Sequence, residues 1–249
     1  MPSYSSQTIT FDGAKNLFAK KQWELGAQVA QHYLTMIQKA SIPMSTVAKN
    51  IKTLFEAYAD ETPASTTHPK FVFMRDAIKM AQEPKKKDTI TAEEALLSQS
   101  MAAWLFKSGE RGLANAYYIK SNAHTEHSMK LVQWAKTCEA NEVDLFLLRS
   151  VLQYLCVGKI EPAKHLHKLF NNIFGTMKAF SDSPATHLAI LISRACSVGA
   201  PELFHILEEK YQMTLLRDPN LKKYMVKIGE MYFKILPPKG FLASLFDQE

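Results

Sequence analysis

The sequence lacks the features that mark several protein classes. Its longest apolar stretches, such as residues 188–192, are far shorter than the roughly 20 residues of a membrane-spanning helix. The first ten residues contain neither the apolar run of a secretory signal nor the arginine-rich pattern of a transit peptide. The three cysteines, Cys138, Cys156 and Cys196, are widely spaced and form no CxxC motif, which is typical of a reducing compartment. We therefore expect a cytoplasmic protein that does not insert directly into a membrane.

A strong excess of one charge is also missing. The chain has 30 Lys and Arg against 24 Asp and Glu, a formal net charge of +6. The only dense basic run, Lys85-Lys86-Lys87, fits a loop between two helices, with a localisation signal as the alternative. Nucleic-acid-binding domains concentrate positive charge on one face, and those of the RNA-recognition type add stacking aromatic residues. Nucleic acid is therefore not an expected partner.

Motifs for catalysis and cofactor binding are weak or missing. Residues 109–112 (GERG) lack the preceding strand and the lysine of a phosphate-binding loop. His124 and His127 are spaced i,i+3, whereas a zincin-type site needs histidines at i,i+4, a glutamate and a third ligand. We interpret them as exposed histidines at a helix start, and Cys156 as a small hydrophobic residue in an apolar helix. A non-enzymatic protein without a cofactor is expected, and a helical metallohydrolase using His124 and His127 is the remote alternative.

The hydrophobic pattern predicts an all-α fold. Apolar residues recur at helical spacing, and prolines such as Pro184, Pro201 and Pro219 stand where helices begin. Alternating strand patterns are scarce, and only residues 174–180 offer an alternative as one short β-hairpin. The predicted helices cover residues 8–20, 23–40, 44–60, 68–82, 92–107, 110–121, 124–138, 142–157, 162–173, 184–198, 201–210 and 219–235.

A degenerate repeat runs through three segments, residues 17–30, 105–118 and 154–167. Each has an apolar pair, a polar turn and then an alanine that opens a second helix. The alanines are Ala27, Ala114 and Ala163, and the large apolar residues nine positions earlier are Phe18, Leu105 and Tyr154. Stacked pairs of this kind predict a right-handed, tetratricopeptide-like α-solenoid of antiparallel helix pairs. We expect a single domain over 8–246, with halves at 8–122 and 123–246; the alternative is a compact bundle with accidental self-similarity.

Two apolar segments in the C-terminal half are candidates for partner binding. Residues 241–246 (FLASLF) follow Pro237-Pro238, so they either fold back onto the core or dock a partner. Residues 174–180 are expected to expose apolar side chains in a loop. Solenoids bind peptides and helices along their faces, with aromatic side chains as anchors.

Two longer stretches carry a family resemblance. Residues 141–158 (NEVDLFLLRSVLQYLCVG) and 209–238 (EKYQMTLLRDPNLKKYMVKIGEMYFKILPP) resemble the Golgi to ER traffic protein 4 family. The matching residues are Val143, Asp144, Phe146, residues 151–156, Tyr211, Leu215, Arg217, Asp218, Pro219, Tyr224, Ile228, Gly229, Tyr232, Phe233, Pro237 and Pro238. The second stretch is the more specific one, because Arg-Asp-Pro and Ile-Gly at this spacing are not required for a helix to form.

The resemblance implies a scaffold that delivers tail-anchored membrane proteins to the ER by linking a ubiquitin-like-domain adaptor to a targeting ATPase. The implied adaptor contacts are Phe174, Met177, Phe180, Tyr211, Leu215, Arg217, Tyr224 and Phe241. The family usually carries a further basic helix pair for the ATPase, and here only ten residues precede Phe11. The ATPase contact is then expected at Lys15, Lys20 and Lys21, or the chain is a truncated form. A helical-repeat subunit of another multiprotein complex is the alternative function.

Overall fold

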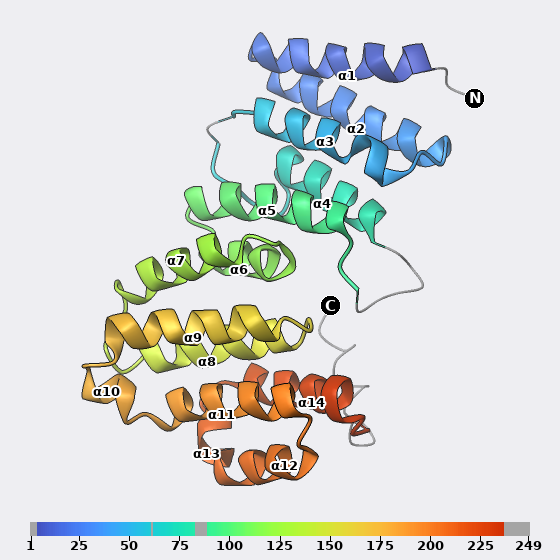
Figure 1. The fold of residues 1–249 in the computed structure, drawn as a ribbon. Coiled ribbons are helices and arrows are strands. Elements are labelled where there is room, and N and C mark those ends of the chain that lie inside the picture. The colour runs from blue at the N-terminus through green and yellow to red at the C-terminus, as the bar shows by residue number, and fades with distance from the viewer. Residues whose placement is uncertain (1–3, 61, 83–88, 237–249) are drawn as a thin grey trace. The chain divides into compact units, whose positions relative to one another are not determined.

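The computed structural model describes residues 4–60, 62–82 and 89–236 (Figure 1). Every regular element in these ranges is a helix, so the all-α prediction is confirmed. None of these helices combines the length and the apolar character needed to cross a membrane. The chain forms two compact units, residues 1–123 (unit 1) and 124–249 (unit 2), which are described separately. One continuous domain over 8–246 stays a prediction.

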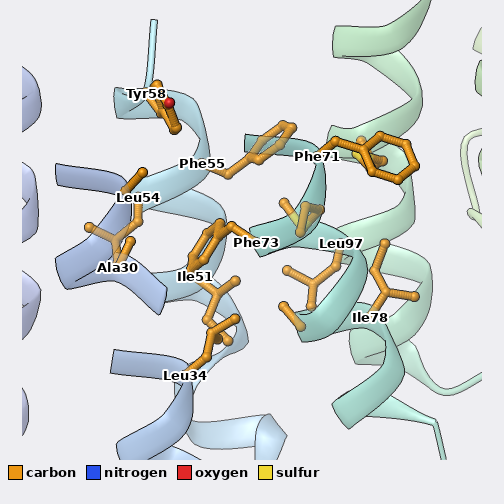
Figure 2. Close-up of a cluster of buried hydrophobic side chains, with 14 of the residues drawn as sticks. Ala30, Leu34, Ile51, Leu54, Phe55, Tyr58, Phe71, Phe73, Ile78 and Leu97 are labelled. Carbon is orange, nitrogen blue, oxygen red and sulfur yellow. The ribbon is translucent and has the colours of Figure 1, made fainter. Parts of the chain in front are cut away.

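Unit 1 consists of packed helices, and the connections after residues 19, 39 and 107 are turns of three or four residues, whereas those after residues 57 and 81 span ten or eleven residues. The described helices are α1 (Tyr4–Ala19), α2 (Trp23–Lys39), α3 (Met44–Ala57), α4 (Pro69–Ala81), α5 (Ala92–Lys107) and α6 (Arg111–Lys120). α1 packs mainly on α2 and α5 on α6, while α3 and α4 contact each other and α5 (Figure 1). Figure 2 shows Leu34, Ile51 and Phe73, from α2, α3 and α4, in the apolar core between these helices. Each helix buries one apolar stripe there, as the helical period of the sequence predicts.

Unit 2 is organised around one central helix. The described helices are α7 (His124–Ala135), α8 (Val143–Leu155), α9 (Ile160–Phe174), α10 (Lys178–Ser181), α11 (Pro184–Val198), α12 (Pro201–Lys210), α13 (Gln212–Leu215) and α14 (Pro219–Phe233). The central helix is α8, which contacts α9, α11 and α14, and this explains why its sequence is apolar on nearly every side. Pro184, Pro201 and Pro219 occupy first-turn positions, as expected, because proline needs no amide partner there.

The three repeat segments form the same helix–turn–helix element. In each turn one residue has a positive φ: Lys21 (57°), Gly109 (89°) and Gly158 (75°). The amide of the next residue donates to the carbonyl five positions earlier, as in a Schellman cap, with N···O distances of 2.9–3.0 Å. The alanines at the start of the second helices, Ala27, Ala114 and Ala163, are all buried. The predicted helix pairs are therefore confirmed.

The hairpin considered for residues 174–180 is wrong. α9 continues to Phe174, and residues 178–181 form the short helix α10. The rings of Phe174 and Phe180 lie 6.0 Å apart and both contact the ring of Phe170. The three rings pack together in the interior of unit 2, whereas an isolated two-stranded hairpin is only marginally stable in water.

Candidate docking surfaces

An ion pair joins the two stretches that carry the family resemblance. Asp144, in the first turn of α8, is only 3% exposed. Its Oδ2 atom accepts hydrogen bonds from Nη1 of Arg217 (2.6 Å) and from Oγ of Ser183 (2.5 Å), and its Oδ1 atom lies 3.2 Å from Nη2 of Arg217. Nη2 of Arg217 also donates to the carbonyl oxygen of Asn141 at 3.1 Å. Arg217 thereby ties the segment before α14 to the start of α8.

A second ion pair lies one residue further along the chain. Arg149 of α8 donates from Nε (2.9 Å) and Nη2 (2.6 Å) to Oδ2 of Asp218. The other oxygen of Asp218 accepts the amide of Asn220 at 2.9 Å and so caps the N-terminus of α14. Burial raises the pKa of Asp218, but the Asn220 amide and the Arg149 guanidinium outweigh it, and the net shift of the pKa is downward.

We call these two ion pairs, Asp144–Arg217 and Arg149–Asp218, the α8 clamp. They are aided by Tyr224, whose hydroxyl accepts a hydrogen bond from Nε2 of Gln153 at 3.0 Å. The clamp fixes Arg217 and Asp218, the last two residues of the connection between α13 and α14, against α8, and so limits the movement of the short helix α13 that precedes them. The family-like residues Asp144, Arg217 and Asp218 therefore have a structural role in this chain.

The structure buries several residues that were expected to bind the adaptor. Phe180 is fully buried and Phe174 is also part of the interior, so the exposure expected for residues 174–180 is wrong at these two positions. Leu215, named as an adaptor contact, is buried as well. The aromatic cluster around Phe170 accounts for the two phenylalanines. Met177, Tyr211 and Tyr224 are half-buried, Arg217 is engaged in the clamp with part of its guanidinium in solvent, and Phe241 lies outside the described residues.

Exposed apolar side chains near the clamp were missed by the sequence reasoning. Met213 is 78% exposed and Leu216 54% exposed, on and directly after α13, and Ile206 is exposed on the preceding helix α12. The signal was present in the run Met213–Leu216, but a four-residue helix is too short for periodicity to show that Leu215 faces inward and Leu216 outward. We call Met213 and Leu216 the α13 patch.

In unit 1 the three lysines expected to contact the ATPase are all exposed. Lys15 lies on α1, and Lys20 and Lys21 form the turn before α2. Within the described part of the chain none of the three forms an ion pair. They can therefore offer positive charge to a partner.

Lys70 of unit 1 is instead a buried charge. Its ammonium donates to the carbonyl oxygen of Tyr58 and lies 4.5 Å from the ring centre of Phe55 and 5.3 Å from that of Trp104. These rings and the carbonyl stabilise the cation. Burial nevertheless lowers the pKa of Lys70 to about 8.

The two histidines considered for metal binding do not act together. His127 was expected to be exposed, but it is buried, and its Nδ1 atom lies 2.6 Å from the hydroxyl of Tyr154. Burial lowers the pKa of His127 to about 3, so its ring is neutral at pH 7. His124 faces the ring of His165 instead, at 6.2 Å between centroids. Among the described residues, no three metal-binding side chains come together.

Comparisons with known proteins agree with the resemblance in the sequence. The profile of the Golgi to ER traffic protein 4 family matches residues 4–248. The Golgi to ER traffic protein 4 homolog of Dictyostelium discoideum is 26% identical over 231 residues, 92% of this chain and 71% of that protein. The Homo sapiens homolog is 23% identical over 251 residues, 96% of this chain and 73% of that protein. The crystal structure of C. therm. Get4 has a similar fold, with a TM-score of 0.53 and 16% identity over 98% of this chain and 88% of that one.

Proposed function

This chain belongs to the Golgi to ER traffic protein 4 family, and we propose that it is a non-enzymatic cytoplasmic scaffold in the delivery of tail-anchored membrane proteins to the ER. In this role it binds an adaptor with a ubiquitin-like domain and the targeting ATPase at the same time. Tethering both raises the effective concentration of the client protein near its acceptor. The observation that carries the proposal is the family match over residues 4–248.

The α13 patch is the proposed adaptor surface. Met213 and Leu216 are exposed, while Thr214 and Leu215 between them are buried and anchor the short helix. The clamp prevents this segment from shifting, so little conformational entropy is lost when a partner binds. Arg217 borders the patch with a partly exposed guanidinium, and methionine and arginine are both enriched in protein interfaces.

The ATPase is proposed to bind unit 1 through Lys15, Lys20 and Lys21. Exposed lysines speed the encounter with an acidic surface, and salt weakens their effect because the charges are screened. An ATPase face that carries carboxylates would complement them.

Co-purification from a cytosolic extract on the immobilised full chain tests the adaptor surface. We expect a ubiquitin-like-domain protein, identified by mass spectrometry, in the eluate of the unmodified chain. The double variant Met213→Asp/Leu216→Asp should lose it, because two charges would be placed in an apolar contact. Ile9→Asp, at an exposed isoleucine of unit 1, is the matched control and should retain it.

The ATPase is tested in the same eluates with Lys15→Glu/Lys20→Glu, which should lose the ATPase and keep the adaptor. If the Met213→Asp/Leu216→Asp variant still binds the adaptor, the adaptor surface lies elsewhere on the chain and the proposed function stands. If the unmodified chain recovers neither partner, the targeting function is refuted. A reproducible set of other subunits would then favour the alternative, a scaffold subunit of another complex.

A further inference from the structure

A groove between α9 and α11 in unit 2 has a composition that the α13 patch does not share. Its volume is about 390 Å³, and it is open to solvent. Ile190 and Val198 of α11 line it and are 38% and 66% exposed. Both residues are four positions from Arg194, so the three side chains lie on one face of the helix.

The charges along this groove have a single sign. Lys164 from α9 and Arg194 from α11 line it, and no carboxylate does. Lys164 pairs only with Glu161 at 2.9 Å, and both groups are well exposed, so this pair is weak. Arg194 has no hydrogen bond or ion pair with any residue that the structure describes. The groove therefore presents positive charge that a carboxylate could neutralise.

His167 adds an unused hydrogen-bonding atom. It lines the groove, and its Nε2 atom is buried without a hydrogen-bond partner among the described residues. Burial lowers the pKa of His167, so the ring is neutral at pH 7 and this nitrogen can donate or accept according to the tautomer. Because a buried polar atom without a partner costs free energy, a polar group that enters the groove would be stabilised there.

We propose that this groove binds a segment of a partner protein in which one or two apolar side chains lie next to aspartate or glutamate. The apolar side chains contact Ile190 and Val198, and the carboxylates pair with Lys164 and Arg194. The groove is formed by other helices than the α13 patch, so this site is a second docking surface that does not depend on the adaptor.

Fluorescence anisotropy with the full chain tests the proposal. The probe is a fluorescein-labelled helical peptide with leucines at i,i+4 among glutamates, and its counterpart carries lysine in place of each glutamate. We expect the acidic peptide to bind at least about tenfold more tightly, since Lys164 and Arg194 attract its glutamates and repel the lysines of its counterpart.

Three variants identify the contact, each checked for unchanged helicity by circular dichroism. Arg194→Glu should remove the preference for the acidic peptide, and Val198→Asp should weaken binding of both peptides. Met213→Asp alters the α13 patch only and should leave peptide binding unchanged. Failure of the adaptor test would therefore not affect this result.

Several results would overturn the proposal. Equal binding of the two peptides would exclude charge complementarity, and unchanged binding by Val198→Asp would place the peptide elsewhere. Phe241→Asp/Phe246→Asp changes a segment outside the described residues; tighter peptide binding by this variant would identify residues 241–249 of the chain as the occupant in place of a partner. A dimer in sedimentation that Val198→Asp converts to monomer would identify a second copy as the occupant.

Discussion

The clamp between Asp144 and Arg217 makes a quantitative prediction about the stability of unit 2. In Arg217→Met the carboxylate of Asp144 loses both guanidinium contacts and keeps only the Ser183 hydroxyl and the Leu145 amide. Leaving one member of a buried ion pair unpaired costs about 3–5 kcal/mol. The two remaining donors and the partial exposure of Arg217 reduce this figure. We expect a loss of about 2–3 kcal/mol in the free energy of unfolding.

Urea unfolding followed by tryptophan fluorescence measures this loss in unit 2. Trp134 packs edge-on against Phe146 of α8 at 4.9 Å, so its emission reports on this helix. Replacing the other two tryptophans, Trp23→Phe/Trp104→Phe, leaves Trp134 as the only reporter in every protein compared.

Two further variants separate the ion pair from general effects of mutation. Asp144→Leu/Arg217→Met removes both charges and should be more stable than Arg217→Met alone, because no buried charge is left unpaired. Lys222→Met, at an exposed position on α14, should change stability by less than about 0.5 kcal/mol. The reasoning fails if Arg217→Met resembles Lys222→Met, or if the double variant is no more stable than the single one.

The remaining predictions concern backbone strain and pH. Lys21→Gly should stabilise unit 1 by about 0.5–1 kcal/mol, because Lys21 has a φ of 57° that costs a side-chain-bearing residue free energy; a lower midpoint in urea would contradict this. The pKa of Lys70 is about 8 when folded and near its ordinary value of about 10.4 when unfolded, so the unfolded chain binds more protons in between. The free energy of unfolding should therefore rise between about pH 8 and pH 10 in the unmodified chain, and this rise should be absent in Lys70→Met. Urea titrations at several pH values measure both. Because the pKa of Asp218 is lowered in the folded chain, its carboxylate stabilises the fold at pH values above about 3.9, the ordinary pKa of aspartate. This stabilisation is lost as the pH falls through the pKa of the folded state. Asp218→Asn keeps a capping side chain but removes the charge. In acid unfolding, the difference in the free energy of unfolding between this variant and the unmodified chain should shrink below about pH 4.

The helix pairs could be predicted from the sequence because their signals are local. Prolines mark helix starts, and Ala27, Ala114 and Ala163 recur at a fixed distance from large apolar residues that are also buried. The two four-residue helices, α10 and α13, were missed because they span barely one turn and show no periodicity.

The candidate site was less accessible to sequence reasoning because its contacts are distant along the chain. Asp144 and Arg217 are 73 residues apart, and no local pattern pairs them. Asp144 entered the sequence analysis only as a residue that matches the family, because its sequence position does not show that the side chain is buried and needs a partner. Whether Leu215 or Leu216 faces the solvent depends on how the clamp orients α13, which is a tertiary effect.

The long sequence separation across the α8 clamp has a consequence for the order in which unit 2 folds. The α8–α9 pair closes through a turn of a few residues, whereas the clamp must close loops of 69 and 73 residues. Since closing a longer loop costs more entropy, we expect the helix pairs to form first and the clamp after the rate-limiting step. Loss of Arg217 should then accelerate unfolding and leave the folding rate nearly unchanged. A partner seated on the α13 patch would slow the release of the clamp, so binding would lengthen the lifetime of folded unit 2.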